Sequence, residues 1–307
     1  MADITEVDYI WKNGTLVPWA EATTHVLSHS LHYGSGVFEG IRCYKDPESD
    51  GSYVFRLRDH MGRLHRSCKI AQIPLPYSVD ELCDATLEVI RANKLPACYI
   101  RPLVYRGYGV MGVDPTNAPT DVVIAVWPWD AYLGPDALEN GVSVGVSSWR
   151  QRSINATPPA MKSTASYMNS LLAKLEAKEH GYAEAIMLNE EGLVCEGTGE
   201  NVFIVRDGVL MTPPLSDGVL EGITRDSVLV IAEELGIPAG ETSLTRSDLY
   251  VADEVFMTGS AAELTPIGAV DNRPIGKPGP VTRRIQDRFF QIVYGNADEY
   301  AGWLTQI

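Results

Sequence analysis

The sequence has 307 residues, of which 45% are hydrophobic and 21% charged, a composition typical of a globular chain with one large or two ordinary domains. Its 25 Lys and Arg against 40 Asp and Glu give a formal net charge of −15, which opposes binding to a nucleic-acid backbone. No apolar run approaches the roughly 18 residues of a membrane-spanning helix, and the acidic N-terminal segment has no signal-peptide pattern. We therefore expect a cytoplasmic protein with no nucleic-acid or membrane partner.

The cysteines are scattered and form no C-x-x-C pair. An odd number of distant thiols in a chain of this size favours reduced cysteines over a disulfide framework. The five are Cys43, Cys68, Cys83, Cys98 and Cys195.

The first half of the chain mixes predicted strands and helices. Asn13-Gly14 between two apolar pairs indicates a hairpin, and apolar residues at helical spacing indicate two helices. In chain order we expect strands at 9–11, 16–18 and 53–57, a short helix from Met61, a helix after Ser78, and strands at 98–106 and 121–127.

The second half follows a segment rich in proline and glycine, WPWDAYLGP, which is the best candidate for a linker. We expect a strand at 141–146, a helix at 167–179, hairpins at 185–195 and 201–211, and a helix after Gly222. Because strands come in runs without regular alternation with helices, the pattern predicts an α+β fold. The expected domains are residues 1–127, a linker at 128–137, and residues 138–307.

One of the eight lysines stands apart. Lys162 has no charged neighbour within several residues, whereas the others lie in polar loops, beside turns or on charged helix faces. A partly desolvated lysine loses its proton more easily, as an attacking amine must. By itself this evidence favours an ordinary loop lysine.

Three further segments have residues suited to holding a charged cofactor. The turn EGTGEN (196–201) carries two glycine-flanked carboxylates between strands. LEGITRD (220–226) begins a helix whose free amides suit a phosphate, and GSAAE (259–263) is a small-residue turn that follows a strand. Each also has an ordinary explanation, as a hairpin connection, a capped helix or a plain turn.

Taken in order, these segments resemble the bacterial and archaeal branched-chain amino acid aminotransferases. The resemblance runs from about Tyr9 to Trp303 and also includes YGSGVFEGIRCY (33–44) and YIRPL (99–103). It implies the two-domain architecture of fold-type IV pyridoxal-phosphate enzymes, like that of D-amino acid aminotransferase, with a smaller N-terminal domain and a larger cofactor-binding C-terminal domain.

The resemblance also implies a role for each site residue. Lys162 would be the Schiff-base lysine and the proton-transfer base, Glu196 the partner of the pyridinium nitrogen, and Tyr167 that of the phenolic oxygen. The phosphate would bind Arg63, Ile223, Thr224, Gly259 and Ser260. The substrate would bind Ser260, Ala261 and Tyr99 through its α-carboxylate, Arg101 and Tyr33 through a distal carboxylate, and Phe38, Gly40, Val113 and Tyr132 through its side chain.

The implied reaction moves the amino group of L-leucine, L-isoleucine or L-valine to 2-oxoglutarate. Tyr33 and Val113 would be supplied by a neighbouring subunit of a homodimer or larger homo-oligomer. Where many relatives have a Gly-Gly-Asn-Tyr run, this chain has Ser163-Thr164-Ala165-Ser166-Tyr167, which leaves the fine substrate preference open.

Alternative functions stay open at this point. The same fold also serves D-amino acid transaminases, (R)-amine transaminases and aminodeoxychorismate lyases, and a catalytically silent binding module is a more distant possibility. The spacing of His25, His29 and His32 suggests imidazoles on one helix face and hence a metal site, but no acidic or cysteine ligand lies nearby, so we expect no metal.

Overall fold

The computed structural model describes residues 4–129 and 134–307, which form two compact units. The N-terminal unit combines residues 4–129 with 161–165 and 291–307, and the C-terminal unit combines 134–160 with 166–290. The sequence predicts a single boundary at 128–137. The units differ from this because Ser163 bridges to Val37 and the last strand of the chain pairs with the N-terminal sheet.

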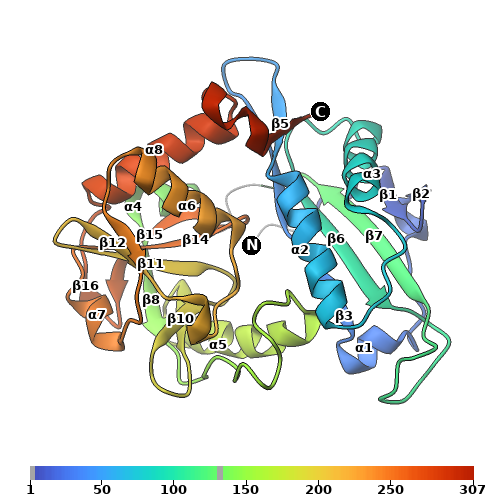
Figure 1. Cartoon of the computed structure of the whole chain (residues 1–307), viewed down its shortest axis with the longest axis horizontal. Coiled ribbons are helices and arrows are strands. Elements are labelled where there is room, and N and C mark those ends of the chain that lie inside the picture. The colour runs from blue at the N-terminus through green and yellow to red at the C-terminus, as the bar shows by residue number, and fades with distance from the viewer. Residues whose placement is uncertain (1–3, 130–133) are drawn as a thin grey trace. The chain divides into compact units, whose positions relative to one another are not determined.

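The N-terminal unit is built on an eight-stranded sheet in the order β17-β5-β4-β6-β7-β1-β2, with β3 also paired to β6 (Figure 1). The pairs that the structure records in this sheet are antiparallel. Its strands are β1 (Tyr9–Lys12), β2 (Thr15–Pro18), β3 (Gly36–Phe38), β4 (Ile41–Lys45), β5 (Ser52–Phe55), β6 (Cys98–Arg106), β7 (Thr120–Trp127) and β17 (Leu304–Gln306).

Helices α2 (Leu57–Ile70) and α3 (Val79–Ala92) cover this sheet (Figure 1). Their apolar faces bury Met61, Leu64, Leu82 and Val89 in one core with the sheet residues. Ser78 begins α3 with a capping box that it forms with Glu81. The short helical segments of this unit are η1 (Trp19–Glu21), α1 (His29–Tyr33) and η4 (Asp298–Trp303).

The C-terminal unit contains a nine-stranded sheet in the order β10-β9-β8-β15-β14-β11-β12-β13, with β16 on β15. Because β10 pairs with β11 as well as with β9, six strands close into a ring, in the order β10-β9-β8-β15-β14-β11. The strands are β8 (Val142–Val146), β9 (Glu184–Leu188), β10 (Val194–Gly197), β11 (Asn201–Arg206), β12 (Val209–Thr212), β13 (Ala239–Glu241), β14 (Glu254–Gly259), β15 (Glu263–Val270) and β16 (Arg273–Pro274).

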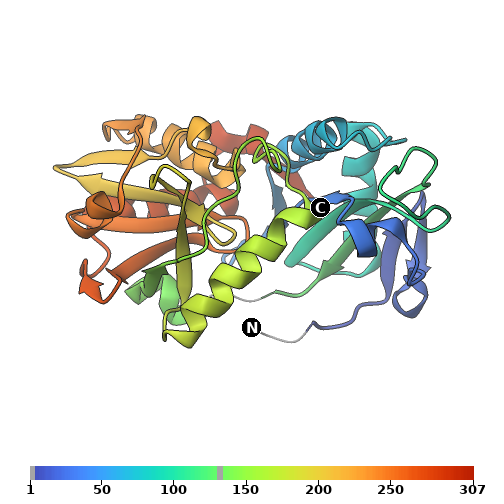
Figure 2. The ribbon, with the colours of Figure 1, turned by 90° about the horizontal axis from the view of Figure 1, so that it is seen from below.

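Helix α5 (Tyr167–Glu179) packs on β8 and β9 and is the long yellow-green helix of Figure 2. Helix α6 (Ile223–Glu234) packs on β13 and β14. The other helical segments are α4 (Pro135–Asn140), η3 (Leu215–Asp217), α7 (Arg246–Tyr250), η2 (Thr164–Ser166), which spans the boundary between the units, and α8 (Pro280–Val293), whose last residues belong to the N-terminal unit. No described helix is both long and apolar enough to cross a bilayer.

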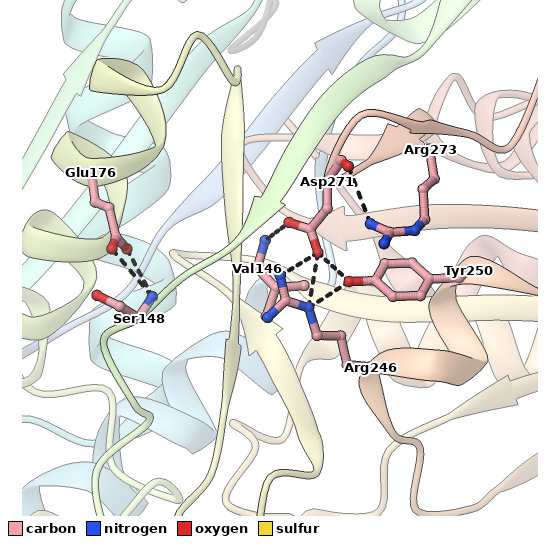
Figure 3. Close-up of polar contacts among 7 residues, drawn as sticks. All are labelled: Val146, Ser148, Glu176, Arg246, Tyr250, Asp271 and Arg273. Atoms are coloured by element: carbon pink, nitrogen blue, oxygen red, sulfur yellow. Dashed lines mark hydrogen bonds and ion pairs between the residues drawn. The ribbon is translucent and has the colours of Figure 1, made fainter.

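A shared carboxylate fixes the end of β8. Asp271 accepts hydrogen bonds from the Val146 amide at 2.8 Å, from Arg246 Nη2 at 2.6 Å and from the Tyr250 hydroxyl at 2.5 Å. Figure 3 shows these side chains converging on Asp271, with Ser148 held separately by Glu176 of α5. The strand and the residues that follow it are thus joined to two helices.

Most predicted elements are confirmed, and two need correction. The helix predicted from Met61 begins at Leu57, which is fully buried, so the strand expected to reach residue 57 ends at Phe55. The three histidines do not share a helix face, because α1 begins only at His29. His29 instead bonds Ser35 and the Gly112 carbonyl, and His32 bonds the Val26 carbonyl.

Candidate active site

Lys162 is anchored at its backbone inside the N-terminal unit. Its amide donates to the Ser67 hydroxyl on α2 at 3.2 Å, and its carbonyl accepts from the Phe38 amide at 3.0 Å. Its Nζ lies 5.2 Å from the centre of the Phe38 ring. The lysine therefore has a fixed position beside β3 and α2, in an aromatic setting that a solvated surface lysine would not have.

Arg101 extends this aromatic setting. Its guanidinium carbon lies 4.7 Å from the Phe38 ring centre and 5.2 Å from that of Tyr99, and Nη2 donates to the Tyr99 hydroxyl at 3.0 Å. A Cβ on Gly40 would lie 2.1 Å from the same hydroxyl, so any larger residue would displace Tyr99. The structure thus brings together Lys162, Phe38, Gly40, Tyr99 and Arg101, which we call the aromatic cluster.

Arg63 lies on α2, one turn before Ser67, and pairs with a carboxylate that the sequence analysis missed. Its Nε and Nη2 each lie 2.7 Å from an oxygen of Glu39, and His60 Nδ1 contacts the same carboxylate at 2.7 Å. All three side chains are buried. Burial alone would raise the pKa of Glu39, but the charge of Arg63 and hydrogen bonds from Arg63 and His60 hold the pKa below its usual value.

Two predicted substrate residues lie outside the aromatic cluster and near each other. The Tyr33 ring packs at 4.5 Å from the ring of His29, whose Nε2 bonds the carbonyl of Gly112, next to Val113. Tyr33 is 43% and Val113 is 87% exposed. Tyr33 and Val113 therefore lie near His29, outside the aromatic cluster that contains Lys162. Tyr132, a third predicted pocket residue, lies outside the described residues.

Glu196 holds a fixed orientation on β10 of the C-terminal unit. One carboxylate oxygen accepts from Gln151 Nε2 at 2.5 Å, and the other accepts from the Leu220 amide at 3.0 Å. Across the sheet Glu196 pairs with Asn201, which in turn pairs with Thr258. Directly opposed residues share a face, so the register places these three polar side chains in one row.

Tyr167 begins α5 near Glu196. Arg152 interacts electrostatically with both, and its Nη1 donates to the Ser166 carbonyl at 2.7 Å. Burial lowers the pKa of Arg152, whereas Glu196 and Tyr167 raise it. Even with that lowering, a guanidinium stays charged at neutral pH, so this part of the unit presents a cation beside a carboxylate and a phenol.

The start of α6 offers backbone donors close to this row. The helix begins after Gly222 with no side-chain cap, so its first amides suit an anion. A Cβ on Gly222 would lie 1.9 Å from the Asn201 side-chain oxygen. Asn201 also donates to the Leu220 carbonyl at 3.0 Å, and these contacts fix Ile223 and the buried Thr224 relative to Glu196.

The turn after β14 lies beside the turn that carries Glu196. Gly259 pairs with Glu263 across the turn, and a Cβ on Gly259 would lie 3.3 Å from the Gly199 carbonyl. Ser260 and Ala261 therefore follow directly beside the 196–201 turn. The C-terminal unit thus brings together every predicted cofactor residue that it contains, namely Tyr167, Glu196, Ile223, Thr224, Gly259 and Ser260.

The donor set fits pyridoxal phosphate. The group needs an amine, a carboxylate and an anion cradle. The C-terminal unit contains the carboxylate of Glu196 and the uncapped start of α6, and the N-terminal unit contains the amine of Lys162. Arg101 Nε, Arg152 Nε and the Thr258 hydroxyl are buried and have no hydrogen-bond partner within the described residues. Buried polar groups normally find partners, so these atoms are suited to a polar ligand.

Sequence reasoning missed three residues of these clusters. Glu39 had a usable signal, because a lone acid in the apolar run GVFEGI needs a buried partner. Gln151 and Arg152 had none, since they lie in an ordinary polar segment. Lys174, one of the lysines expected on charged helix faces, forms an ion pair with the buried carboxylate of Glu184 at 2.5 Å.

Comparison with known proteins shows the family to which the chain belongs. Residues 36–270 match the family model described as amino-transferase class IV, and the chain belongs to that family. It is 50% identical to the branched-chain-amino-acid aminotransferase of Escherichia coli strain K12 over 305 residues, which cover 98% of each chain.

Solved structures show the same fold. The structure of the Escherichia coli branched-chain amino acid aminotransferase superimposes with a TM-score of 0.95 at 51% identity, covering 98% of this chain and 99% of that one. The pyridoxal-phosphate form of the branched-chain amino acid aminotransferase from Thermobaculum terrenum gives a TM-score of 0.92 at 39% identity, covering 98% of each chain.

Proposed function

We propose that this protein is a pyridoxal-phosphate-dependent transaminase that moves the amino group of L-leucine, L-isoleucine or L-valine to 2-oxoglutarate. The observation that carries the proposal is the aromatic cluster. It places a single guanidinium, Arg101, against the Phe38 and Tyr99 rings beside Lys162. An apolar surface with one charged donor suits both a branched aliphatic side chain and the distal carboxylate of glutamate.

The cofactor, when bound, accepts an amino group from an amino acid and returns it to a 2-oxo acid. Lys162 would supply the amine that holds the cofactor covalently and would move the proton at the substrate α-carbon. Glu196 would accept a hydrogen bond from the ring nitrogen, and Tyr167 would hold the phenolic oxygen. The phosphate would be held by Arg63, Ser260, the Thr224 hydroxyl and the amides of Ile223, Thr224 and Gly259.

The substrate is oriented by a second group of side chains. Tyr99 and the amides of Ser260 and Ala261 bind the α-carboxylate, and Arg101 binds the distal carboxylate of glutamate. Phe38, Gly40 and Tyr132 contact the aliphatic side chain. These roles are consistent with the buried Nε of Arg101, which has no hydrogen-bond partner within the described residues.

We also propose a homo-oligomer in the cytoplasm. Tyr33 and Val113 are exposed. Tyr33 packs on His29, which bonds the carbonyl of Gly112 next to Val113, and such exposed neighbours suit residues that complete the site of another subunit. The five cysteines are free thiols, as a reducing compartment allows. Sedimentation of the wild type and of Val113→Asp tests the assembly, because a buried charge at an interface should dissociate it.

A screen of amino donors tests the activity. With 2-oxoglutarate as acceptor, the L-forms of leucine, isoleucine and valine should react, and their D-forms and (R)-amines should not. Turnover of D-alanine or of an (R)-amine at a rate above that of L-leucine would replace the proposal with one of the other activities known for this fold.

A further inference from the structure

Gln151 is in direct contact with the Glu196 carboxylate. Its Nε2 donates to Glu196 Oε1 at 2.5 Å, while the opposite oxygen accepts from the Leu220 amide. Gln151 is 3% exposed. The carboxylate proposed to face the cofactor is therefore supported by a neutral side chain and a backbone amide.

The orientation of the Gln151 carboxamide is determined by its other partners. Nε2 also donates to the Gly218 carbonyl at 3.4 Å, and Oε1 accepts from the Arg152 amide at 3.2 Å. A rotated carboxamide would place its oxygen against two acceptors and its NH2 against a donor. The contact network thus assigns the donor end to Glu196.

The segment that carries Gln151 is anchored along its length. The Ser147 amide donates to the Ile186 carbonyl at 2.9 Å, and the Gln151 amide donates to the Leu188 carbonyl at 2.8 Å. Glu176 of α5 accepts a hydrogen bond from the Ser147 hydroxyl. It also accepts from the Ser148 amide at 2.9 Å, a contact that Figure 3 shows. Gln151 is therefore fixed to β9, the strand that pairs with β10 at Glu196.

A neutral donor suits the task assigned to Glu196. A carboxylate must stay ionised and correctly aimed to accept the N–H of a pyridinium ring. Arg152 interacts electrostatically with Glu196 and favours its ionised form, while the Gln151 amide donates a direct hydrogen bond to it. An amide supports the charge by hydrogen bonding and fixes the direction, as orienting partners do for metal ligands.

We propose that Gln151 is the positioning residue of Glu196, acting on the cofactor only through that carboxylate. The inference rests on the proposed function, because it requires Glu196 to face the cofactor nitrogen.

Gln151→Met tests the proposal with little change of volume. The dissociation constant of the apoprotein for pyridoxal phosphate, from an absorbance titration, should rise about tenfold, a typical loss when an orienting partner is removed. The kcat should fall while the KM for L-leucine stays within twofold. An unchanged dissociation constant in a folded Gln151→Met protein would overturn the proposal.

Gln286→Met is the matched control. Gln286 is equally buried at 4% exposed, and its Nε2 also donates to two carbonyls, of Leu138 and Leu264, at 3.0 and 2.9 Å. These partners lie on other elements than Glu196. This variant should lose thermal stability like Gln151→Met but keep the cofactor dissociation constant within twofold. An equal loss of cofactor affinity in both would mean that Gln151 has only a structural role.

Gln151→Glu provides a second readout through pH and does not depend on the first variant being folded. Two carboxylates in contact share one proton at low pH and repel each other once both ionise. Cofactor affinity of this variant should therefore approach that of the wild type near pH 5 and fall as pH rises to 8. A ratio to wild type that does not change with pH would contradict the proposal.

Glu196→Gln distinguishes a failure of the role proposed for Gln151 from a failure of the role proposed for Glu196. If it weakens cofactor binding and Gln151→Met does not, only the role of Gln151 fails. If neither variant changes the dissociation constant, the place of Glu196 in the proposed function fails as well.

Discussion

The guanidinium of Arg63 and the carboxylate of Glu39 form a two-point pair, with Nε–Oε1 and Nη2–Oε2 distances of 2.7 Å, in the buried interior of the N-terminal unit. Such a pair fixes the plane of the guanidinium. If Arg63 holds a phosphate, Glu39 determines where its remaining N–H groups point.

Glu39→Gln should leave Arg63 as a buried charge without its counter-ion. Breaking one side of a buried pair costs about 3–5 kcal/mol, so the free energy of unfolding measured in urea should fall by that order. Glu88→Gln, at an exposed position of α3 in the same unit, is the control and should change little. A loss below about 1 kcal/mol for Glu39→Gln would show that the pair does not stabilise the unit.

The same pair predicts acid sensitivity. Burial lowers the pKa of His60 below 6.5, and Arg63 and His60 hold the pKa of Glu39 below 4.5. Because both pKa values are lower in the folded state, the unfolded chain binds more protons in acid. Stability should decline as pH falls below about 6.5 and more steeply below about 4.5. Glu39→Gln should make the decline below about 4.5 shallower without removing it, because Glu176 and Asp271 also have a lowered pKa. Parallel curves for the two proteins would contradict this.

Lys162→Ala should abolish the absorbance band of the covalently bound cofactor and nearly all transamination. Alanine has no amine to bind the cofactor covalently or to transfer the proton of the substrate α-carbon. Lys69→Ala is the control, because Lys69 is exposed on the same helix, α2, that holds the Lys162 amide through Ser67. A Lys162→Ala protein with normal turnover would remove the lysine from the mechanism.

Glu196→Gln should slow removal of the substrate α-proton far more than Glu200→Gln does. Glu196 is held by Gln151 and Leu220, whereas Glu200 accepts from the Gly199 amide at 3.0 Å within its own turn. Deuterium exchange at the α-carbon of leucine measures this step. Equal small losses would mean that neither carboxylate faces the cofactor.

Arg101→Ala should act on one class of substrate. The guanidinium lies on two aromatic rings, where a bound carboxylate gains a charged donor and a leucine side chain gains none. Single-turnover rates with glutamate and 2-oxoglutarate should fall by the equivalent of about 2–4 kcal/mol, and those with leucine should change little. Equal losses would place Arg101 at the α-carboxylate or in the support of the fold.

Sequence patterns predicted local elements well and non-local pairing poorly. Helix α5 runs from Tyr167 to Glu179 as expected, and the hairpin at Asn13-Gly14 is present. Both could be predicted because helical periodicity and turn type depend on residues that are close in sequence. The bridge between Val37 and Ser163 joins residues that no local signal connects. For the same reason the sequence could not assign Lys162 to the N-terminal unit.

The same distinction between local signals and non-local pairing applies to the residues of the candidate site. Titratable residues with unusual neighbours, such as Lys162 and Glu196, could be proposed from sequence. The residues that hold them in place were not, because Gln151 has no charge or spacing to distinguish it and its contacts exist only after the β8–β9 pairing forms. Supporting residues of this kind become visible only when strands distant in sequence are side by side.

Strand β17 follows every other described strand in the chain, and it pairs with β5 through Leu304–Phe55, Thr305–Val54 and Gln306–Tyr53. During synthesis on the ribosome, the N-terminal unit is made first but cannot complete its sheet until residues 304–306 emerge. Until then the edge of β5 presents unpaired backbone groups, which are open to pairing with another nascent chain. The C-terminal unit has all of its described strands by residue 274, so we expect the order of folding in the cell to reverse the order of translation.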